Sequence, residues 1–213
     1  MIKRKNNKKR PPIILLAIAS FFLVIVLSFV LIWFVLVREY NQWEKDFNRD
    51  KSEENFVTLN DTSVLESLNK KIAIFSNSNL KTDFIEISDR EFLYIFGESL
   101  NQTLPLNIKF EKAFVLTNKG YWDIYIQTKY GNRILPWYFL RLQKDNTQTA
   151  QLYVKKMSIG NFDFTDYGAK IIIDKINVGI KDALLLINES DFTGRIFRNI
   201  ELEVGKLIIK GDK

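Results

Sequence analysis

The chain has 213 residues, with 31 lysines and arginines, 25 aspartates and glutamates, and no histidine or cysteine. Without histidine and cysteine, disulfide bonds, cysteine-ligated metals, thiol nucleophiles and histidine acid–base chemistry are excluded. Six of the cations lie within residues 1–10, which contain no acid, so the net charge of +6 reports a short basic tail and is no evidence for nucleic-acid binding.

Residues 13–37 contain no charged side chain. As a helix this segment is about 37 Å long, which is enough to cross a hydrocarbon core about 30 Å thick. Trp33 near its end, and Tyr40 and Trp43 beyond it, are typical of a membrane interface. The segment predicts an uncleaved transmembrane signal anchor. A cleaved signal peptide is the alternative, but its apolar region is usually about 7–15 residues long, and no small-residue cleavage site follows Val37.

The charges on either side of the anchor predict its orientation. The flank at residues 1–12 is strongly basic, whereas the other flank mixes cations with acids. The positive-inside rule therefore predicts a cytoplasmic tail at 1–12 and an extracytoplasmic location for 38–213, in a single-pass protein of the cell membrane. Residues 38–56 are charged and poor in aliphatic side chains, which indicates a stalk. Residues 57–213 have no internal repeat and no Gly/Pro-rich break, so we expect one extracytoplasmic domain.

Two helices are predicted at the start of this domain. A capping-box pattern begins at Ser63 and is followed by apolar residues at helical spacing, which predicts a helix near 63–75. A second capping box begins at Ser88 and opens a helix at about 89–103, which Pro105 ends.

From Leu106 the apolar period changes to two, which predicts strands. The predicted strands run from Leu106 to a turn at 118–120, then over 121–128, 134–142 and 152–159, with further turns at 130–132 and 145–147. Such tight connections predict an antiparallel meander. The run 134–142 is apolar on both faces apart from Arg141, and its Pro136 indicates an edge strand or a bulge.

A third helix is predicted at 166–188, and a last strand at 196–209, in which Gly205 allows a kink. The predicted order is therefore α-α-β-β-β-β-α-β. This is an α+β fold, with an N-terminal transmembrane helix followed by one extracytoplasmic domain of long helices packed on a curved antiparallel sheet.

The sequence contains no hydrolytic, zinc-binding or phosphate-binding motif. Asp163 and Asp166 are interpreted as helix caps rather than calcium ligands, because no EF-hand-type loop surrounds them. Glu201 and Glu203 lie on one face of a predicted strand, as a glycosidase pair does, but a solvated face explains them better. We therefore predict a non-catalytic protein, with no catalytic residue, no metal ligand and no cofactor.

Aromatic residues gather in two neighbouring predicted strands, at Trp122, Tyr125, Tyr130, Trp137, Tyr138 and Phe139. A well-packed core explains this pattern without a binding site. If helices cover only one side of the sheet, the run 134–142 instead leaves an apolar surface, which is typical of a partner site or of a groove for an apolar ligand. Binding of single-stranded nucleic acid is disfavoured, because the chain is neutral outside its tail.

The basic tail and single anchor are followed by three distinctive segments, SDREFLYIFGESLN, YWDIYIQTKYGNRILPWYF and LYVKKMSIGNFDF, the last with a Ser158-Ile159-Gly160 turn before a long helix. With these features the chain resembles the YpmS-like family of bitopic envelope proteins of low-GC Gram-positive bacteria. The order of helices and strands is also similar to a half-module of tubular lipid-binding (TULIP-like) domains. That similarity implies a ligand channel between the long helices and a concave sheet, and it implies no catalytic residues.

We expect the outer domain to bind a lipid or other amphiphile in a groove between the third helix and strands 121–142, because burial of an acyl chain gains about 0.8 kcal/mol per methylene. The expected lining residues are Trp122, Ile124, Trp137 and Phe139 on the sheet, and Ile172, Ile176, Ile180 and Leu184 on the helix. The alternative is a scaffold or interaction module of a cell-envelope assembly for cell wall synthesis, division or secretion. The expected partners are the membrane together with a lipid or envelope proteins, and no nucleic acid.

Overall fold

The computed structural model describes residues 13–51, 56–103, 106–144, 150–163, 165, 170, 173–174, 177–178 and 194–213. The chain divides into two compact units, Met1–Trp43 and Glu44–Lys213. The second unit holds both sheets and includes the end of the predicted stalk. All packing described below lies within this second unit.

Helix α1 extends from Ile13 to Arg49 and therefore continues from the predicted anchor into the predicted stalk. Among the residues that the structure describes, no helix is both long enough and apolar enough to cross a membrane. The membrane anchor at 13–37 stays a prediction from the sequence.

Helix α2 extends from Thr62 to Asn77, which confirms the helix predicted near 63–75. The capping box predicted at Ser63 is wrong. The N-cap is Asp61, whose carboxylate accepts hydrogen bonds from the backbone N–H and the hydroxyl of Ser63, at 3.2 and 2.5 Å. Aspartate is as good an N-cap as serine, so the helix begins one position earlier.

Strand β1, Thr82–Ser88, was not predicted and lies between α2 and helix α3, Asp89–Thr103. The bounds of α3 confirm the helix predicted at 89–103, and its capping box is also confirmed. The Glu91 backbone N–H donates to the Ser88 hydroxyl at 3.2 Å, and the Glu91 carboxylate accepts from the Ser88 backbone N–H at 2.7 Å.

Glu91 also joins the two helices. Its buried carboxylate accepts hydrogen bonds from the Ser67 hydroxyl and the Lys71 ammonium on α2, both at 2.7 Å. Burial raises the pKa of the Glu91 carboxyl, but the hydrogen bonds from Lys71, Ser88 and Ser67 outweigh burial, so the pKa lies below its ordinary value. The Glu91 carboxylate is therefore charged, and its hydrogen bonds link α3 to α2.

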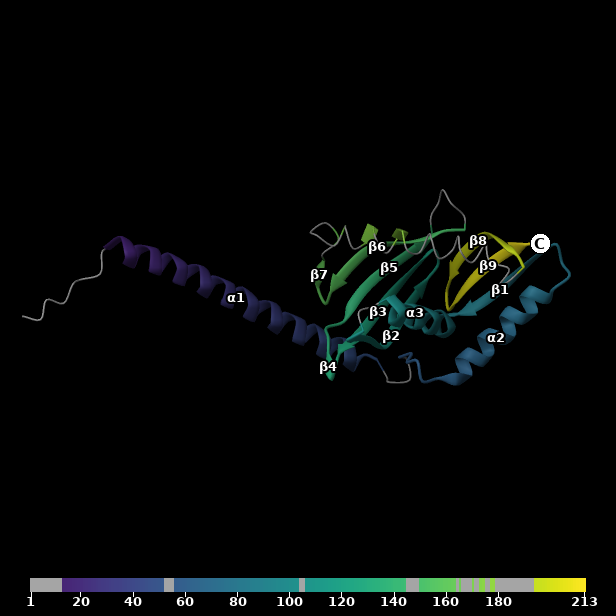
Figure 1. Cartoon of the computed structure of the whole chain (residues 1–213), viewed down its shortest axis with the longest axis horizontal. Coiled ribbons are helices and arrows are strands. Elements are labelled where there is room, and N and C mark those ends of the chain that lie inside the picture. Colours follow the sequence, from purple (N-terminus) through teal and green to yellow (C-terminus); the bar gives the residue numbers. More distant parts are fainter. Residues whose placement is uncertain are drawn as a thin grey trace, which may run out of the picture. The chain divides into compact units, whose positions relative to one another are not determined.

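The larger sheet is antiparallel, with the strand order β2-β3-β5-β6-β7 and with β4 paired to β3 (Figure 1). Its strands are β2 Ile108–Asn118, β3 Tyr121–Tyr130, β4 Arg133–Ile134, β5 Tyr138–Lys144, β6 Leu152–Ile159 and β7 Phe162–Asp163. The turns predicted at 118–120 and 130–132 are confirmed. Gly120 and Gly131 adopt φ of 83° and 58° there, a conformation that favours glycine.

The single strand predicted at 134–142 is wrong. Strand β4 ends at Ile134 and β5 begins at Tyr138, with no strand between them. Pro136 lies in this gap, where its missing N–H costs no ladder hydrogen bond.

The smaller sheet has the strand order β1-β9-β8 and is also antiparallel. The strand predicted at 196–209 is in fact a hairpin of β8, Ile196–Glu203, and β9, Lys206–Asp212. Gly205 adopts φ of 75° and reverses the chain instead of kinking it. The α+β class and the antiparallel pairing are confirmed, whereas the predicted element order is wrong because it lacks β1, β4, β7 and β9.

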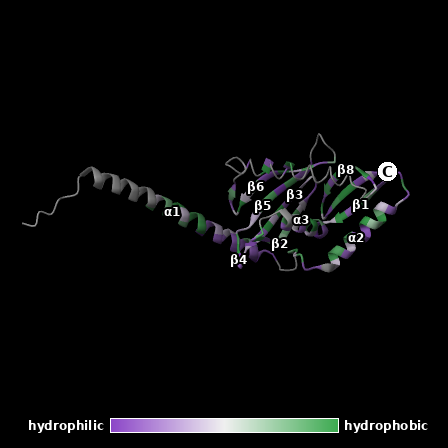
Figure 2. Ribbon diagram, in the orientation of Figure 1, coloured by the Kyte–Doolittle hydropathy of each residue, from purple (hydrophilic) through white to green (hydrophobic). Residues whose placement is uncertain are grey.

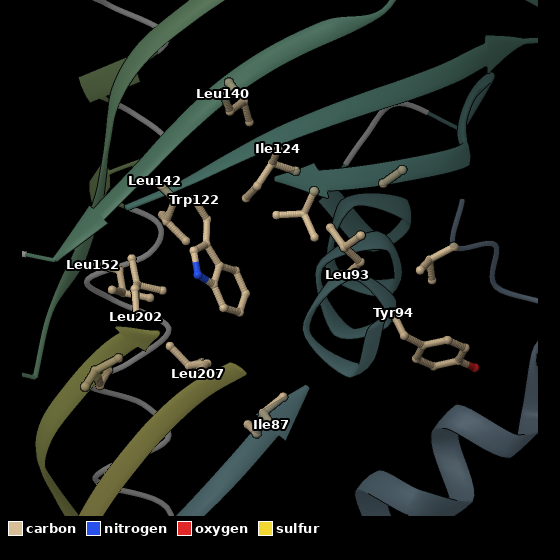
Figure 3. Close-up of a cluster of buried hydrophobic side chains, with 14 of the residues drawn as sticks. Ile87, Leu93, Tyr94, Trp122, Ile124, Leu140, Leu142, Leu152, Leu202 and Leu207 are labelled. Carbon is tan, nitrogen blue, oxygen red and sulfur yellow. The ribbon is translucent and has the colours of Figure 1, made fainter. Parts of the chain in front are cut away.

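The hydrophobic core lies between the two sheets and helices α2 and α3. Hydrophobic and hydrophilic residues alternate along the strands (Figure 2). Side chains of both sheets and of α3 point toward one another in Figure 3. Gly97 of α3 permits close packing there, because a Cβ at this position would lie 3.0 Å from Leu59 and 3.1 Å from Phe110.

A buried arginine ties the end of α2 to the smaller sheet. Arg195 is 3 % exposed, and its guanidinium donates to the carbonyl oxygens of Phe75, Ser78, Leu80 and Gly211 at 2.8–3.2 Å. Carbonyls at a helix C-terminus lack intrahelical partners and carry partial negative charge. Arg195 therefore caps α2 from a distant part of the sequence.

Candidate functional site

The two faces of the larger sheet have different surroundings. Trp122, Ile124 and Leu140 belong to the main core, and Ile124 lies opposite Leu140 in the register of β3 and β5. Because side chains alternate along a strand, Tyr125 and its register partner Phe139 point to the other face. We call this second face, with the rings that gather on it, the aromatic face.

Two of the predicted groove residues are core residues. Trp122 and Ile124 are 0 % and 1 % exposed. The Trp122 indole N–H donates to the carbonyl oxygen of Glu203 at 2.9 Å, and its ring packs edge-on against Phe92 at 5.2 Å. Figure 3 shows Trp122 and Ile124 among side chains of both sheets and α3. Their surfaces are covered by the protein itself.

The other two predicted sheet residues, Trp137 and Phe139, lie apart from that core cluster. Phe139 packs against Tyr125 with ring centroids 5.3 Å apart, and Trp137 contacts the ring of Phe56 at 5.6 Å. The expectation that Trp122, Ile124, Trp137 and Phe139 line one wall is therefore wrong, since the two pairs occupy opposite faces of the sheet.

The helical half of the predicted groove, Ile172, Ile176, Ile180 and Leu184, lies outside the described residues. Ile173 and Asn177, which fall in the predicted helix 166–188, are helical. Ile173 is buried in the core, and the Asn177 side chain bonds the backbone of Val154 twice, accepting from its N–H at 2.6 Å and donating to its carbonyl at 3.0 Å. This amide occupies the edge of β6 and protects it from pairing with another strand.

The aromatic face is covered by residues that the sequence assigns to the stalk. Phe47 lies 4.8 Å from Tyr125, 5.3 Å from Trp137 and 6.1 Å from Phe114, between ring centroids. Phe56 also contacts Phe114, at 5.9 Å. The apolar surface expected on this side of the sheet exists, but Phe47 and Phe56 of the same chain occupy it.

Two lysines add cation–π contacts to the aromatic face. The Lys112 ammonium lies 4.5 Å from the Phe56 ring and 5.6 Å from the Trp137 ring. The Lys51 ammonium lies 4.8 Å from the Phe114 ring. Aromatic packing with such contacts is worth about 0.5–1.5 kcal/mol per ring pair beyond area burial. Together these contacts hold Phe47, Lys51 and Phe56 against the sheet.

Beyond the covered rings the aromatic face remains partly exposed. In register across β2, β3, β5 and β6 lies a row that we call the outer row, formed by Leu116, Asp123, Arg141 and Lys156. Arg141 donates two hydrogen bonds to Asp123, at 2.7 and 2.8 Å, and its guanidinium lies 4.7 Å from the Tyr121 ring. The hydrogen bond to Asp123 raises the pKa of Arg141.

The carboxylates singled out in the sequence have structural partners. Asp163 accepts from the Thr165 backbone N–H at 2.9 Å and pairs with Lys156 at 2.9 Å. Hydrogen bonds from the Thr165 hydroxyl, from Lys156 and from the Thr165 backbone N–H lower the pKa of Asp163 to about 2. Glu201 pairs with Lys210, and Glu203 with Lys119. Asp166 lies outside the described residues. Within the described ranges, no three acidic side chains are grouped so as to hold a metal ion.

The chain matches no family model, no curated protein and no solved structure.

Phe47, Phe56 and Arg195 are the residues that the sequence reasoning missed. Phe47 and Phe56 lie in a segment otherwise typical of a solvated stalk, and their only signal is that each is a large apolar residue in it. Arg195 gives no local signal, because a buried arginine and an exposed one look the same in sequence.

Proposed function

We propose that the chain is a non-catalytic single-pass envelope protein whose outer domain works as an interaction module in a cell-envelope assembly. Residues 1–12 are cytoplasmic, 13–37 form the membrane anchor and 38–213 lie outside the membrane. The observation that carries the proposal is the packing of Phe47 on the aromatic face, at 4.8–6.1 Å from three rings of the sheet. The resemblance to YpmS-like envelope proteins supports the same class.

The position of Phe47 in the chain supports a scaffold role. Phe47 lies only ten positions after Val37, the last residue of the predicted anchor. Ten residues span at most about 35 Å when extended, and about 15 Å as a helix. Since Phe47 is packed on the sheet, the segment that follows the anchor is too short to act as a long tether, and the domain meets its partners close to the membrane surface.

The outer row is the surface that we assign to the partner. It combines one exposed apolar side chain, Leu116, with the ion pair of Asp123 and Arg141 and the nearby Tyr121 ring. Arginine and tyrosine are enriched among the residues that dominate binding at protein interfaces, and a charged pair supplies orientation. A partner with apolar and charged side chains in matching positions fits this surface.

Cross-linking in cells tests the proposal. A photoreactive residue at Leu116 of the full-length chain is expected to give a discrete cross-linked product with another envelope protein. A photoreactive residue at Leu65 is the matched control, because both leucines are 39 % exposed and Leu65 lies on α2. Irradiation should give at least a tenfold higher yield at Leu116, since a specific interface buries one patch only. Equal products at both positions, or none at Leu116, would contradict the proposal.

Binding of a lipid or other amphiphile is a second candidate. The four sheet residues expected to line its groove do not form one wall, so the candidate depends on the predicted helix. It is favoured by the described part of the predicted helix, because Ile173 is buried in the core and Asn177 is bonded to β6, so helical residues do lie against the larger sheet. A stoichiometric lipid adduct in the native mass spectrum of the full-length protein would favour this candidate over the scaffold.

A further inference from the structure

One end of the larger sheet exposes several large apolar side chains. Leu106 is 99 % exposed, Ile134 62 % and Tyr130 51 %. Backbone pairing brings them together. Tyr130 lies opposite Arg133 in the hairpin of β3 and β4, and the Gly131 N–H donates to the Asn107 carbonyl at 3.2 Å. We call this end, residues 106–111 with 129–134, the hairpin tip.

The apolar side chains of the hairpin tip point to both faces of the sheet. Tyr130 follows the alternation of β3 on the side of Trp122, whereas Ile134 lies opposite Lys129 on the side of the aromatic face. A flat partner docked on one face would cover only one of these side chains. An apolar medium that receives the tip end-on covers all of them.

The charges of the hairpin tip indicate the kind of medium. Its two segments contain three cations, Lys109, Lys129 and Arg133, and one acid, Glu111. Lys129 and Glu111 pair at 2.6 Å, so the tip keeps a net positive charge next to its apolar side chains. Basic residues flanking exposed apolar ones, with a tyrosine between them, are typical of segments that enter the interface of an anionic membrane.

The segment with which the second unit begins packs near the hairpin tip. Phe47, at the end of α1, contacts Trp137, which follows Ile134 by only three residues. In Figure 1 strand β4 lies at the end of the domain remote from β1, β8 and β9. The segment that holds Phe47 and the hairpin tip therefore lie at the same end of the larger sheet.

We propose that the hairpin tip inserts into the interfacial layer of an anionic lipid bilayer. Leu106 and Ile134 enter the boundary between headgroups and acyl chains, Tyr130 lies at headgroup level, and Lys109 and Arg133 face the lipid phosphates. The proposal rests on the proposed function in one respect, which is that the anchor brings the domain to the membrane. Insertion at a second point fixes the orientation of the outer domain, which a single anchor helix does not.

The absence of native cysteine makes single-cysteine labelling clean. The full-length variants Ile134→Cys and Ile74→Cys, each carrying an environment-sensitive fluorophore, are placed in nanodiscs that contain phosphatidylglycerol or only phosphatidylcholine. Ile74 is the matched control, since it is also 62 % exposed and lies on α2. Figure 1 shows α2 beside β1, away from β4. Headgroup-depth nitroxide lipids are expected to quench the Ile134 label at least about fivefold more than the Ile74 label in phosphatidylglycerol.

Two further results bear on the anionic surface. The double change Lys109→Glu and Arg133→Glu, or the replacement of phosphatidylglycerol by phosphatidylcholine, is expected to remove most of the extra quenching at Ile134, because either change removes the attraction between these cations and anionic headgroups. Quenching of the Ile134 label that is equal in both lipids would overturn the assignment of an anionic surface. If the Ile134 and Ile74 labels are quenched equally in phosphatidylglycerol, the hairpin tip does not insert into the bilayer.

The same samples separate this proposal from the proposed function. Retention of the full-length chain in the membrane fraction at alkaline pH tests the anchor, whereas quenching at Ile134 tests the hairpin tip. A retained chain with an unquenched Ile134 label overturns the tip proposal alone. If the chain is extracted, the anchor fails, and the labelled chain is added to preformed phosphatidylglycerol vesicles, where absence of quenching overturns the tip proposal as well.

Discussion

Replacement of Arg195 by methionine is expected to destabilise the outer domain by about 3–5 kcal/mol. Methionine keeps much of the volume of the side chain but donates no hydrogen bond. The carbonyl oxygens of Phe75, Ser78, Leu80 and Gly211 then lose the donor that satisfies them, and the end of α2 loses a compensating positive charge. Urea denaturation of the full-length protein in nanodiscs, followed by circular dichroism, measures the change.

Arg198→Met is the matched control for this prediction. Arg198 lies three residues further along, on β8, and its exposed guanidinium pairs with Asp212 at 3.0 Å. An exposed ion pair contributes about 0–1 kcal/mol, so this variant should unfold at nearly the wild-type urea concentration. The stability loss of Arg195→Lys should lie between those of the two methionine variants. Lysine keeps the positive charge, but its single ammonium nitrogen cannot reach all four carbonyl oxygens at once. If Arg195→Met costs no more than Arg198→Met, Arg195 does not hold α2 to the smaller sheet.

Replacement of Trp122 by alanine is expected to cost about 3–5 kcal/mol, the range for truncation of a buried aromatic side chain. Trp122 is fully buried, contacts Phe92 and donates to the Glu203 carbonyl across the two sheets. The change therefore leaves a cavity in the main core and an unsatisfied carbonyl. Urea denaturation followed by circular dichroism is suitable here, since the substitution itself alters tryptophan fluorescence.

This prediction also separates a core from a groove. Phe84→Ala removes an aromatic side chain that is 56 % exposed on β1, and it should cost less than about 1 kcal/mol. A Trp122 that lined an open groove would behave like Phe84, because solvent or ligand would already contact it. A small stability loss at Trp122, accompanied by the loss of a bound amphiphile, would restore the groove that the sequence suggested.

The sequence predicted α3 to the residue because several independent signals agree there. The capping box of Ser88 and Glu91 marks its start, apolar residues recur at helical spacing, and Pro105 follows its end. The β2–β3 hairpin was equally accessible, since Gly120 marks the turn between two alternating segments.

The β8–β9 hairpin was missed although its signal is present. Apolar residues occupy even positions before Gly205, as in Leu202, and odd positions after it, as in Leu207 and Ile209. A kinked strand keeps its parity, whereas a two-residue hairpin reverses it, as the pairing of Leu202 with Leu207 shows. Strand β1 was missed because its alternation is short and lies between two strong helix signals.

The candidate groove failed for a reason that lies beyond local sequence. Which face Phe139 occupies depends on the register of β5 against β3, and the connection through β4 and Pro136 hides that register. The covering of the aromatic face depends on Phe47 and Phe56, whose tertiary contacts have no periodic signature. Composition predicted an unusual aromatic sheet, and only the three-dimensional pairing shows which rings are core and which are covered by the chain that enters the domain.

Cysteine accessibility in intact cells tests the central claim, a single-pass protein with its domain outside the membrane, most directly. Because the chain has no native cysteine, Lys8→Cys reports on the tail and Ile74→Cys on the domain. A membrane-impermeant maleimide is expected to label Ile74→Cys in intact cells and Lys8→Cys only after permeabilisation. Labelling of Lys8→Cys in intact cells, or protection of Ile74→Cys until permeabilisation, would contradict the account.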